Sequence, residues 1–186
     1  VTVYDQALKE TIRQAKTVPV LINYTANGKR QEKTPDDADL ALIAKIDASE
    51  IPYWYPTDHL PNGFNTRQPM ESHKYTHVHH FYTKRVLFIF SAMKNKFHGK
   101  LNWLLSSIVE GNSKLNRERP FGLPSKLSGT LYVSSMIREI DAISFAKRKI
   151  ETYKRAIIRL DTGNSSLGVN SAATWNVANN SIDYIF

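Results

Sequence analysis

Cysteine is absent from this chain of 186 residues. Without a thiol, the protein forms no disulfide, offers no thiolate ligand to zinc and has no cysteine nucleophile. No stretch approaches the roughly 18 apolar residues of a membrane-spanning helix, so we expect no membrane partner. The sequence also has no internal repeat, and 41% hydrophobic with 23% charged residues excludes a disordered, collagen-like or coiled-coil chain. A globular protein remains, and the lack of cysteine favours the cytoplasm.

Acidic residues are outnumbered: 25 Lys and Arg face 17 Asp and Glu, for a net charge of +8. Such a balance favours polyanionic partners, above all nucleic acid. The charge is concentrated, with nine basic and three acidic residues over 71–119, and seven against three over 138–159. Aromatic residues interleave with these charges, which is typical of surfaces that grip phosphates and stack bases. The alternative is a solvated helix face beside core aromatics.

Apolar spacing and turn residues predict an α+β fold, a single mixed domain over 1–186. We expect a β-hairpin near the N-terminus around Asn27-Gly28, three to four longer helices, and short strands. The helix beginning at Thr34-Pro35 directs Leu40, Ile43 and Ile46 inward. The expected helices cover 4–16, the stretch after Thr34, 84–97, 100–115 and 141–157; the expected short strands cover 129–134, 169–172 and 182–186. Proline at four positions makes 50–76 an ordered aromatic-rich loop without regular structure.

The segment that looks functional runs from Thr76 to Arg85. Thr83 is a good N-cap, which places Lys84 and Arg85 in the first turn of a helix, against its dipole. An anion bound there would compensate, because free amides and basic side chains then cooperate, and phosphate is the obvious candidate. The alternative is that acids from elsewhere in the chain pair with both cations.

Histidines in this segment raise the question of a metal. On a strand, His77 and His79 share a face, and Asp58, His59 or His73 could supply a third ligand. The spacing matches no established zinc pattern. We therefore favour histidines that contact phosphate or bases, or that are hydrogen-bonded in the core.

Several segments together resemble a known family. They are Val18-Pro-Val-Leu-Ile-Asn-Tyr24 with the polar stretch from Gly28 to Leu40, Ile51-Pro-Tyr-Trp-Tyr-Pro-Thr-Asp58, Thr76-His-Val-His-His-Phe-Tyr-Thr-Lys-Arg85 and Asn180-Ser-Ile-Asp-Tyr-Ile-Phe186. In this order they resemble a stretch of large prokaryotic DNA methyltransferases that act on the exocyclic amino group of adenine or cytosine. The last segment is similar to the strand that precedes the catalytic Asp-Pro-Pro-Tyr/Phe motif of that family.

The departures from the family decide what the resemblance implies. The chain has no Phe-x-Gly-x-Gly loop for S-adenosylmethionine, no Asp-Pro-Pro motif and no Cys-rich ribbon. We therefore expect an excised internal piece, with 161–186 leading into the missing catalytic motif. The resemblance implies a target-recognition region that is inactive alone and holds no cofactor, in a parent enzyme that uses S-adenosylmethionine. Because methylation requires flipping a base out of the duplex, a separate DNA-gripping element has a physical purpose.

Double-stranded DNA and the catalytic core of the parent enzyme are the expected partners. The residues predicted to contact DNA are Lys84, Arg85, His79, His80, Tyr82, Arg117, Arg119, Lys147, Arg148 and Lys154, with Trp54 and Tyr55 as weaker stacking candidates. A second hypothesis is a structural scaffold between domains that never touches DNA. A third is an independent His-dependent nuclease or metal hydrolase that uses His77, His79 and Asp58.

Overall fold

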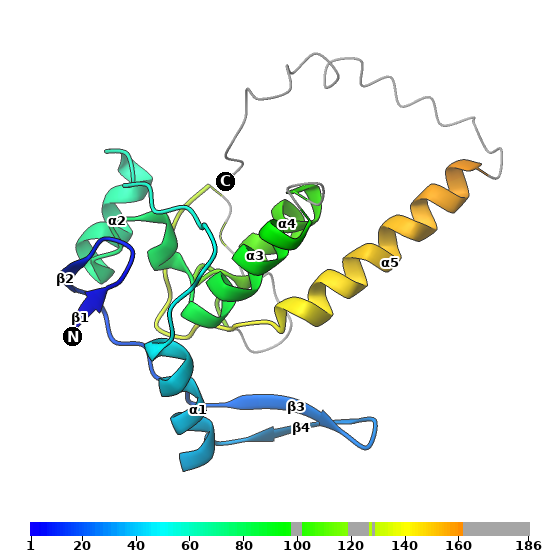
Figure 1. Ribbon diagram of the computed structural model, residues 1–186, viewed down its shortest axis with the longest axis horizontal. Coiled ribbons are helices and arrows are strands. Elements are labelled where there is room, and N and C mark those ends of the chain that lie inside the picture. Colours follow the sequence, from blue (N-terminus) through cyan, green and yellow to red (C-terminus); the bar gives the residue numbers. More distant parts are fainter. Residues whose placement is uncertain (98–101, 119–126, 128, 162–186) are drawn as a thin grey trace.

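A computed structural model describes residues 1–97, 102–118, 127 and 129–161 (Figure 1). The described chain is a mixed α+β fold, as predicted, with two separate antiparallel hairpins and a set of packed helices. The elements are β1 (Thr2–Asp5), β2 (Glu10–Arg13), β3 (Ile22–Ala26), β4 (Lys29–Lys33), α1 (Asp37–Ala48), α2 (Phe64–His73), η1 (Val78–Phe81), α3 (Lys84–Lys96), α4 (Asn102–Val109), η2 (Glu110–Asn112) and α5 (Ala142–Asp161).

The N-terminal residues form the β1–β2 hairpin, so the predicted helix over 4–16 is wrong. Thr2 pairs with Arg13 and Asp5 with Glu10. The Asp5 carboxylate accepts hydrogen bonds from the backbone amides of Ala7 (2.9 Å) and Leu8 (3.2 Å), which closes a turn. Such local side-chain bonds compete with helix formation.

The predicted hairpin at Asn27-Gly28 is confirmed as β3–β4. Both turn residues have positive φ, +51° and +73°, as a two-residue hairpin turn of this hand requires. The next helix, α1, begins two residues later than predicted, because Asp36 rather than Thr34 is its N-cap and shares a capping box with Asp39.

The β3–β4 hairpin and α1 together project from the rest of the molecule, and we call residues 18–50 the arm (Figure 1). α1 contains no buried residue. Ile43 and Ile46 are half-buried, but Leu40 is 44% exposed, so its predicted inward position is wrong. The arm therefore keeps its apolar side chains largely in contact with solvent.

The segment 50–76 contains a helix, α2, which the sequence analysis did not expect. Pro69 lies inside α2, where a proline removes a backbone hydrogen bond and disfavours the helix. Burial compensates, since Pro69 is among the largest fully buried side chains. α2 ends at His73 and is capped by Lys74, whose φ of +60° is the left-handed conformation common at helix C-termini.

The longer helices after residue 83 follow the prediction closely. α3 begins after Thr83 and ends at Lys96, and α5 is capped by Asp141, which accepts from the amides of Ile143 (3.0 Å) and Ser144 (3.3 Å). α4 is shorter than predicted and ends in the η2 turn. No strand forms over the described part of 129–134; the two expected strands at 169–172 and 182–186 lie outside the described residues.

Two hydrophobic clusters stabilise the body of the fold. The first joins α2, η1 and the segment before α5, and its buried members are Leu60, Tyr75, Phe81 and Val133. The second joins α3, α4 and α5, and its buried members are Leu104, Ile108 and Ala146. The expected strand at 129–134 does not form, because Val133 packs in the first cluster against Leu60, Tyr75 and Phe81 rather than on a sheet. α5 starts at this second cluster and extends beyond it (Figure 1).

Candidate nucleic-acid interface

The basic start of α3 is engaged within the protein. Lys84 is half-buried; its ammonium donates to the Gln6 side chain and to the Asp47 carbonyl (3.2 Å), and burial lowers its pKa. Arg85 forms an ion pair with Glu139, whose second oxygen accepts a hydrogen bond from Thr83 (2.6 Å). For Arg85 the structure thus matches the alternative in which an acid from elsewhere pairs with it. Both cations therefore already have partners within the fold.

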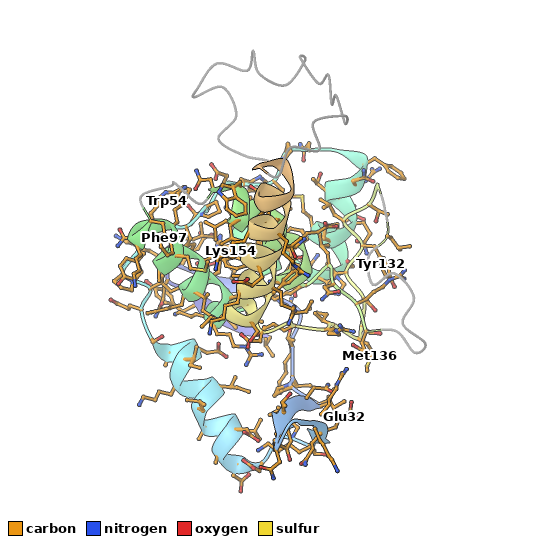
Figure 2. All side chains as sticks on the ribbon, turned by 90° about the vertical axis from the view of Figure 1, so that its right-hand side faces the viewer. Glu32, Trp54, Phe97, Tyr132, Met136 and Lys154 are labelled. Carbon is orange, nitrogen blue, oxygen red and sulfur yellow. The ribbon has the colours of Figure 1, made fainter. Side chains whose placement is uncertain are left out.

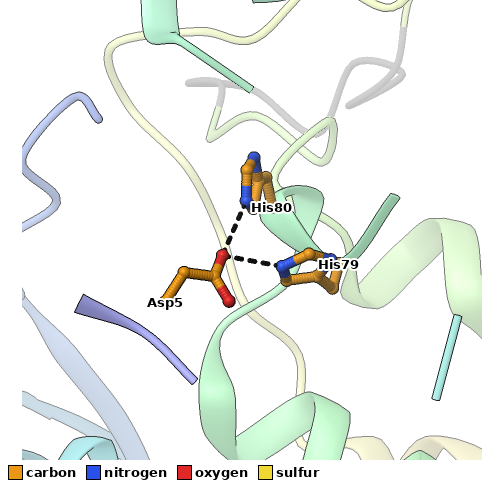
Figure 3. Close-up of side chains that lie close together, drawn as sticks. All are labelled: Asp5, His79 and His80. Carbon is orange, nitrogen blue, oxygen red and sulfur yellow. Dashed lines mark hydrogen bonds and ion pairs between the residues drawn. The ribbon is translucent and has the colours of Figure 1, made fainter. Parts of the chain in front are cut away.

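His79 and His80 face inward, onto the carboxylate of Asp5 (Figure 3). One oxygen, Oδ2, accepts from His79 Nε2 (2.9 Å) and from His80 Nε2 (3.0 Å). The other oxygen holds the turn amides of Ala7 and Leu8. Only 7%, 1% and 8% of the His79, His80 and Asp5 side chains is exposed. The two histidines thus join η1 to the N-terminal hairpin, and in this fold no base could reach them.

The protonation state of this centre follows from its hydrogen bonds. His80 Nδ1 accepts from the backbone amides of Thr76 (3.1 Å) and His77 (3.3 Å), so the proton of a neutral ring sits on Nε2 and is donated to Asp5. Burial lowers the pKa of His80 to about 4. Burial by itself would raise the pKa of Asp5, but the hydrogen bonds from His79, His80 and Leu8 bring it down to about 2. The centre is an ionised carboxylate held by four donors.

Asp5, His79 and His80 form the one group of potential metal ligands found within the described ranges. Their hydrogen bonds do not fit a metal. A ligating histidine normally donates its second N–H to an acceptor, whereas His80 Nδ1 faces two N–H donors. Binding a cation through Nε2 would then require an imidazole without any ring proton. The predicted set of His77, His79 and Asp58 does not come together as ligands either.

Tyr82 and Arg117 are only partly accessible. The Tyr82 ring packs edge-on against Phe90 (6.2 Å between centroids), and burial raises its pKa to about 12. Arg117 pairs through its backbone with Ile137, and its buried Nε has no hydrogen-bond partner among the described residues. Arg119 lies outside the described residues.

The two weaker stacking candidates also make contacts within the fold. Trp54 is 55% exposed, and the Lys94 ammonium lies 3.7 Å from the centre of its ring. The Tyr55 ring packs edge-on against His79, with 6.1 Å between ring centroids. Of the two, Trp54 is the one that remains open to a ligand.

The exposed positive charge of the described chain is clearest on α5. Ala142 and Ala146 are buried, and Ala146 packs against Leu104 and Ile108 of α4, while Lys147, Arg148 and Lys154 are exposed. Lys154 stands on the side of α5 that faces the viewer in Figure 2 and pairs with Glu151 at 2.8 Å. Arg155, exposed one residue further on, completes this basic face, which we define as Lys147, Arg148, Lys154 and Arg155.

The role of Asp5 was invisible to sequence reasoning. It lies 74 and 75 residues before its histidine partners and inside a segment predicted as helix. A run of histidines indicates that their ring nitrogens need hydrogen-bond partners, but it does not show where in the chain those partners lie.

Comparison with protein-family models, with curated proteins and with solved structures finds no match for this chain. Within the part of the chain that the structure describes, no helix combines the length and the apolar character needed to cross a bilayer.

Proposed function

We propose that this chain is the DNA-binding, target-recognition region of a prokaryotic, cytoplasmic DNA amino-methyltransferase that uses S-adenosylmethionine, and that the basic face of α5 contacts duplex phosphates. The resemblance of its segments to that family motivates the class of enzyme. The cofactor and the catalytic residues belong to the parent protein, so the chain alone binds DNA and catalyses nothing.

The observation that carries the proposal is the division of α5 into two sides. Ala146 packs in the second cluster with α4, and Phe145 and Ile150 pack beside it, whereas four exposed cations lie elsewhere on a helix that extends beyond the body of the fold (Figure 1). Lys154 is partly neutralised by Glu151, but such an exposed pair exchanges readily for a phosphate contact. A projecting basic helix can approach a DNA backbone without rearrangement of the core, and phosphate contacts dominate non-specific affinity.

Salt titration tests this proposal. Fluorescence anisotropy with a duplex of about 20 base pairs should give a log Kd that rises linearly with log salt concentration, at about 0.9 per phosphate contact. Lys147→Ala with Arg148→Ala should weaken binding and reduce the slope by about two. The matched control is Lys29→Ala with Arg30→Ala, an equally exposed Lys-Arg pair at the tip of β3–β4. If both double variants lose the same affinity and slope, α5 is not the binding face.

A second function has its own support in the arm. Val18, Val20, Leu21 and Leu42 are each more than half exposed. Several exposed apolar side chains on one projecting part of a chain are typical of a surface that packs on another protein. The arm therefore supports a scaffold role toward the methyltransferase core. A chain that fails to bind duplex DNA even at low salt, but binds the separately expressed core, would favour the scaffold over the DNA-binding region.

A further inference from the structure

An open cavity of about 540 Å³ lies between α2 and the segment that follows Gly129. Its size falls in the range of small-molecule and cofactor sites. α2 lines it with residues from Phe64 to Ser72, and Thr130 and Tyr132 line it from the other segment. It shares no residue with the basic face of α5.

Two aromatic rings border this cavity and are exposed. Phe64, the first residue of α2, is 85% exposed, the largest value among the exposed large hydrophobic residues described. Tyr132, labelled in Figure 2, is 42% exposed. A single exposed aromatic is unremarkable. Two that line one cavity from different segments offer flat apolar surfaces to a flat ligand.

A guanidinium, an amide and a carboxylate line the cavity together with the two rings. Helical spacing puts Arg67, Gln68 and Glu71 on the same side of α2 as Phe64, and all of them line the cavity. Arg67 is exposed and forms no ion pair with another described residue. Gln68 donates from its amide nitrogen to Ser72 (3.2 Å), while its buried Oε1 has no hydrogen-bond partner in the described chain.

This combination matches a nucleobase. Bases present a π-face that stacks on aromatic rings at about 1–3 kcal/mol per base, and edges that pair with amide side chains. A guanidinium beside the rings suits the adjoining phosphate. A carboxylate from Glu71 makes the lining nearly neutral, which disfavours a ligand bound by charge alone.

We infer that this cavity binds an unstacked nucleobase of a nucleic-acid strand, with Phe64 and Tyr132 as stacking surfaces and Arg67 directed to the neighbouring phosphate. The inference rests on the proposed DNA-binding function and adds to it a second contact, distinct from α5, that is made with bases rather than with the backbone. It requires a base that is unpaired or has left the duplex.

Binding to a single strand tests the inference. The probe is an oligothymidylate of about ten nucleotides with one central 2-aminopurine, whose fluorescence is quenched on stacking. The wild-type chain should bind it and quench it. Phe64→Ala with Tyr132→Ala should raise Kd by about 5- to 100-fold, abolish the quenching and leave the salt slope unchanged. Tyr4→Ala, which removes a 63% exposed aromatic that does not line the cavity, is the matched control and should bind as wild type. Far-ultraviolet circular dichroism checks that each variant is folded.

The outcomes separate the two proposals. If the Phe64/Tyr132 double variant binds and quenches like Tyr4→Ala, or if the wild-type chain does not quench the probe, the inference is overturned, whatever α5 does. If the α5 variants bind duplex DNA as wild type while the Phe64/Tyr132 variant loses the single strand, the phosphate surface fails and the base site stands. Titration with deoxyadenosine monophosphate, followed by NMR, adds a readout that needs no long strand. The backbone amide resonances of Phe64 and Tyr132 should shift, and unchanged resonances would contradict the base site.

Discussion

Acid should destabilise this protein through His80 well before its carboxylates are protonated. The ring is buried neutral, with Nδ1 accepting from two backbone amides and Nε2 donating to Asp5. A second proton on Nδ1 would break both amide contacts. Burial therefore lowers the pKa of His80 from its ordinary value of 6.5 to about 4.

The sign and size follow from linkage. Between pH 6.5 and about 4, the unfolded chain binds a proton at this ring and the folded chain does not. Stability from His80 is therefore fully present above pH 6.5 and is lost as the pH falls toward 4. At about 1.4 kcal/mol per pH unit, the loss in the free energy of unfolding is about 3 kcal/mol. His73 and His77 act in the same direction, because burial lowers the pKa of each.

Two variants isolate the contribution of His80. In His80→Asn, an amide oxygen can take the place of Nδ1 as acceptor; in His80→Gln, an amide nitrogen can take the place of Nε2 as donor to Asp5. Neither side chain titrates. Urea unfolding followed by circular dichroism, repeated across this pH range, should show a wild-type decline about 3 kcal/mol larger than that of either variant.

NMR titration gives the result that would refute the reasoning. A His80 ring that titrates near pH 6.5 in the folded protein would mean that Nδ1 is open to solvent protons. If the free energy of unfolding of both His80 variants depends on pH as that of the wild type does, the same conclusion follows. The hydrogen bonds assigned to the ring would then be wrong.

Four further substitutions probe the contacts around the helices. Glu139→Ala removes the partner of both Arg85 and Thr83 and should lower the free energy of unfolding by about 1–3 kcal/mol in urea titration, whereas Glu151→Ala, in an exposed pair, should change it by less than about 1 kcal/mol. Gly111→Ala places a methyl group 2.8 Å from the Phe145 ring and should cost about 1–3 kcal/mol, seen as a lower melting temperature. Leu104→Ala, at a side chain with no exposure, should cost about 2–5 kcal/mol; a cost under 1 kcal/mol would mean that the second cluster is loosely packed.

Local signals predicted the elements that local chemistry determines. Asn27-Gly28 determined the β3–β4 turn because both residues adopt positive φ. The apolar run after Thr83 indicated α3, although the Thr83 side chain donates to Glu139 and not to the start of the helix. The sequence did not predict α2, because Pro69 disfavours a helix unless its burial compensates, and burial is a property of the whole fold.

The site was less predictable than the fold. The sequence placed charge on α5 and identified the histidines as unusual, but the direction in which His79 and His80 point depends on Asp5, far away in the chain. Nothing in the sequence around His79 and His80 therefore indicated that they face Asp5 rather than a base. The aromatic pair of the cavity was equally hidden, because Phe64 lies in the segment expected to be a loop and Tyr132 in one expected to be a strand.

The link from Asp5 to His79 and His80 also has a consequence for the newly made chain. Synthesis proceeds from the N-terminus at about 5–20 residues per second, so the β1–β2 hairpin leaves the ribosome several seconds before residue 80 exists. During that interval the Asp5 carboxylate has only its own turn amides as partners. An isolated two-stranded hairpin is marginal in water. The β1–β2 hairpin is therefore made well before it can settle, because its docking on η1 has to wait for His79 and His80.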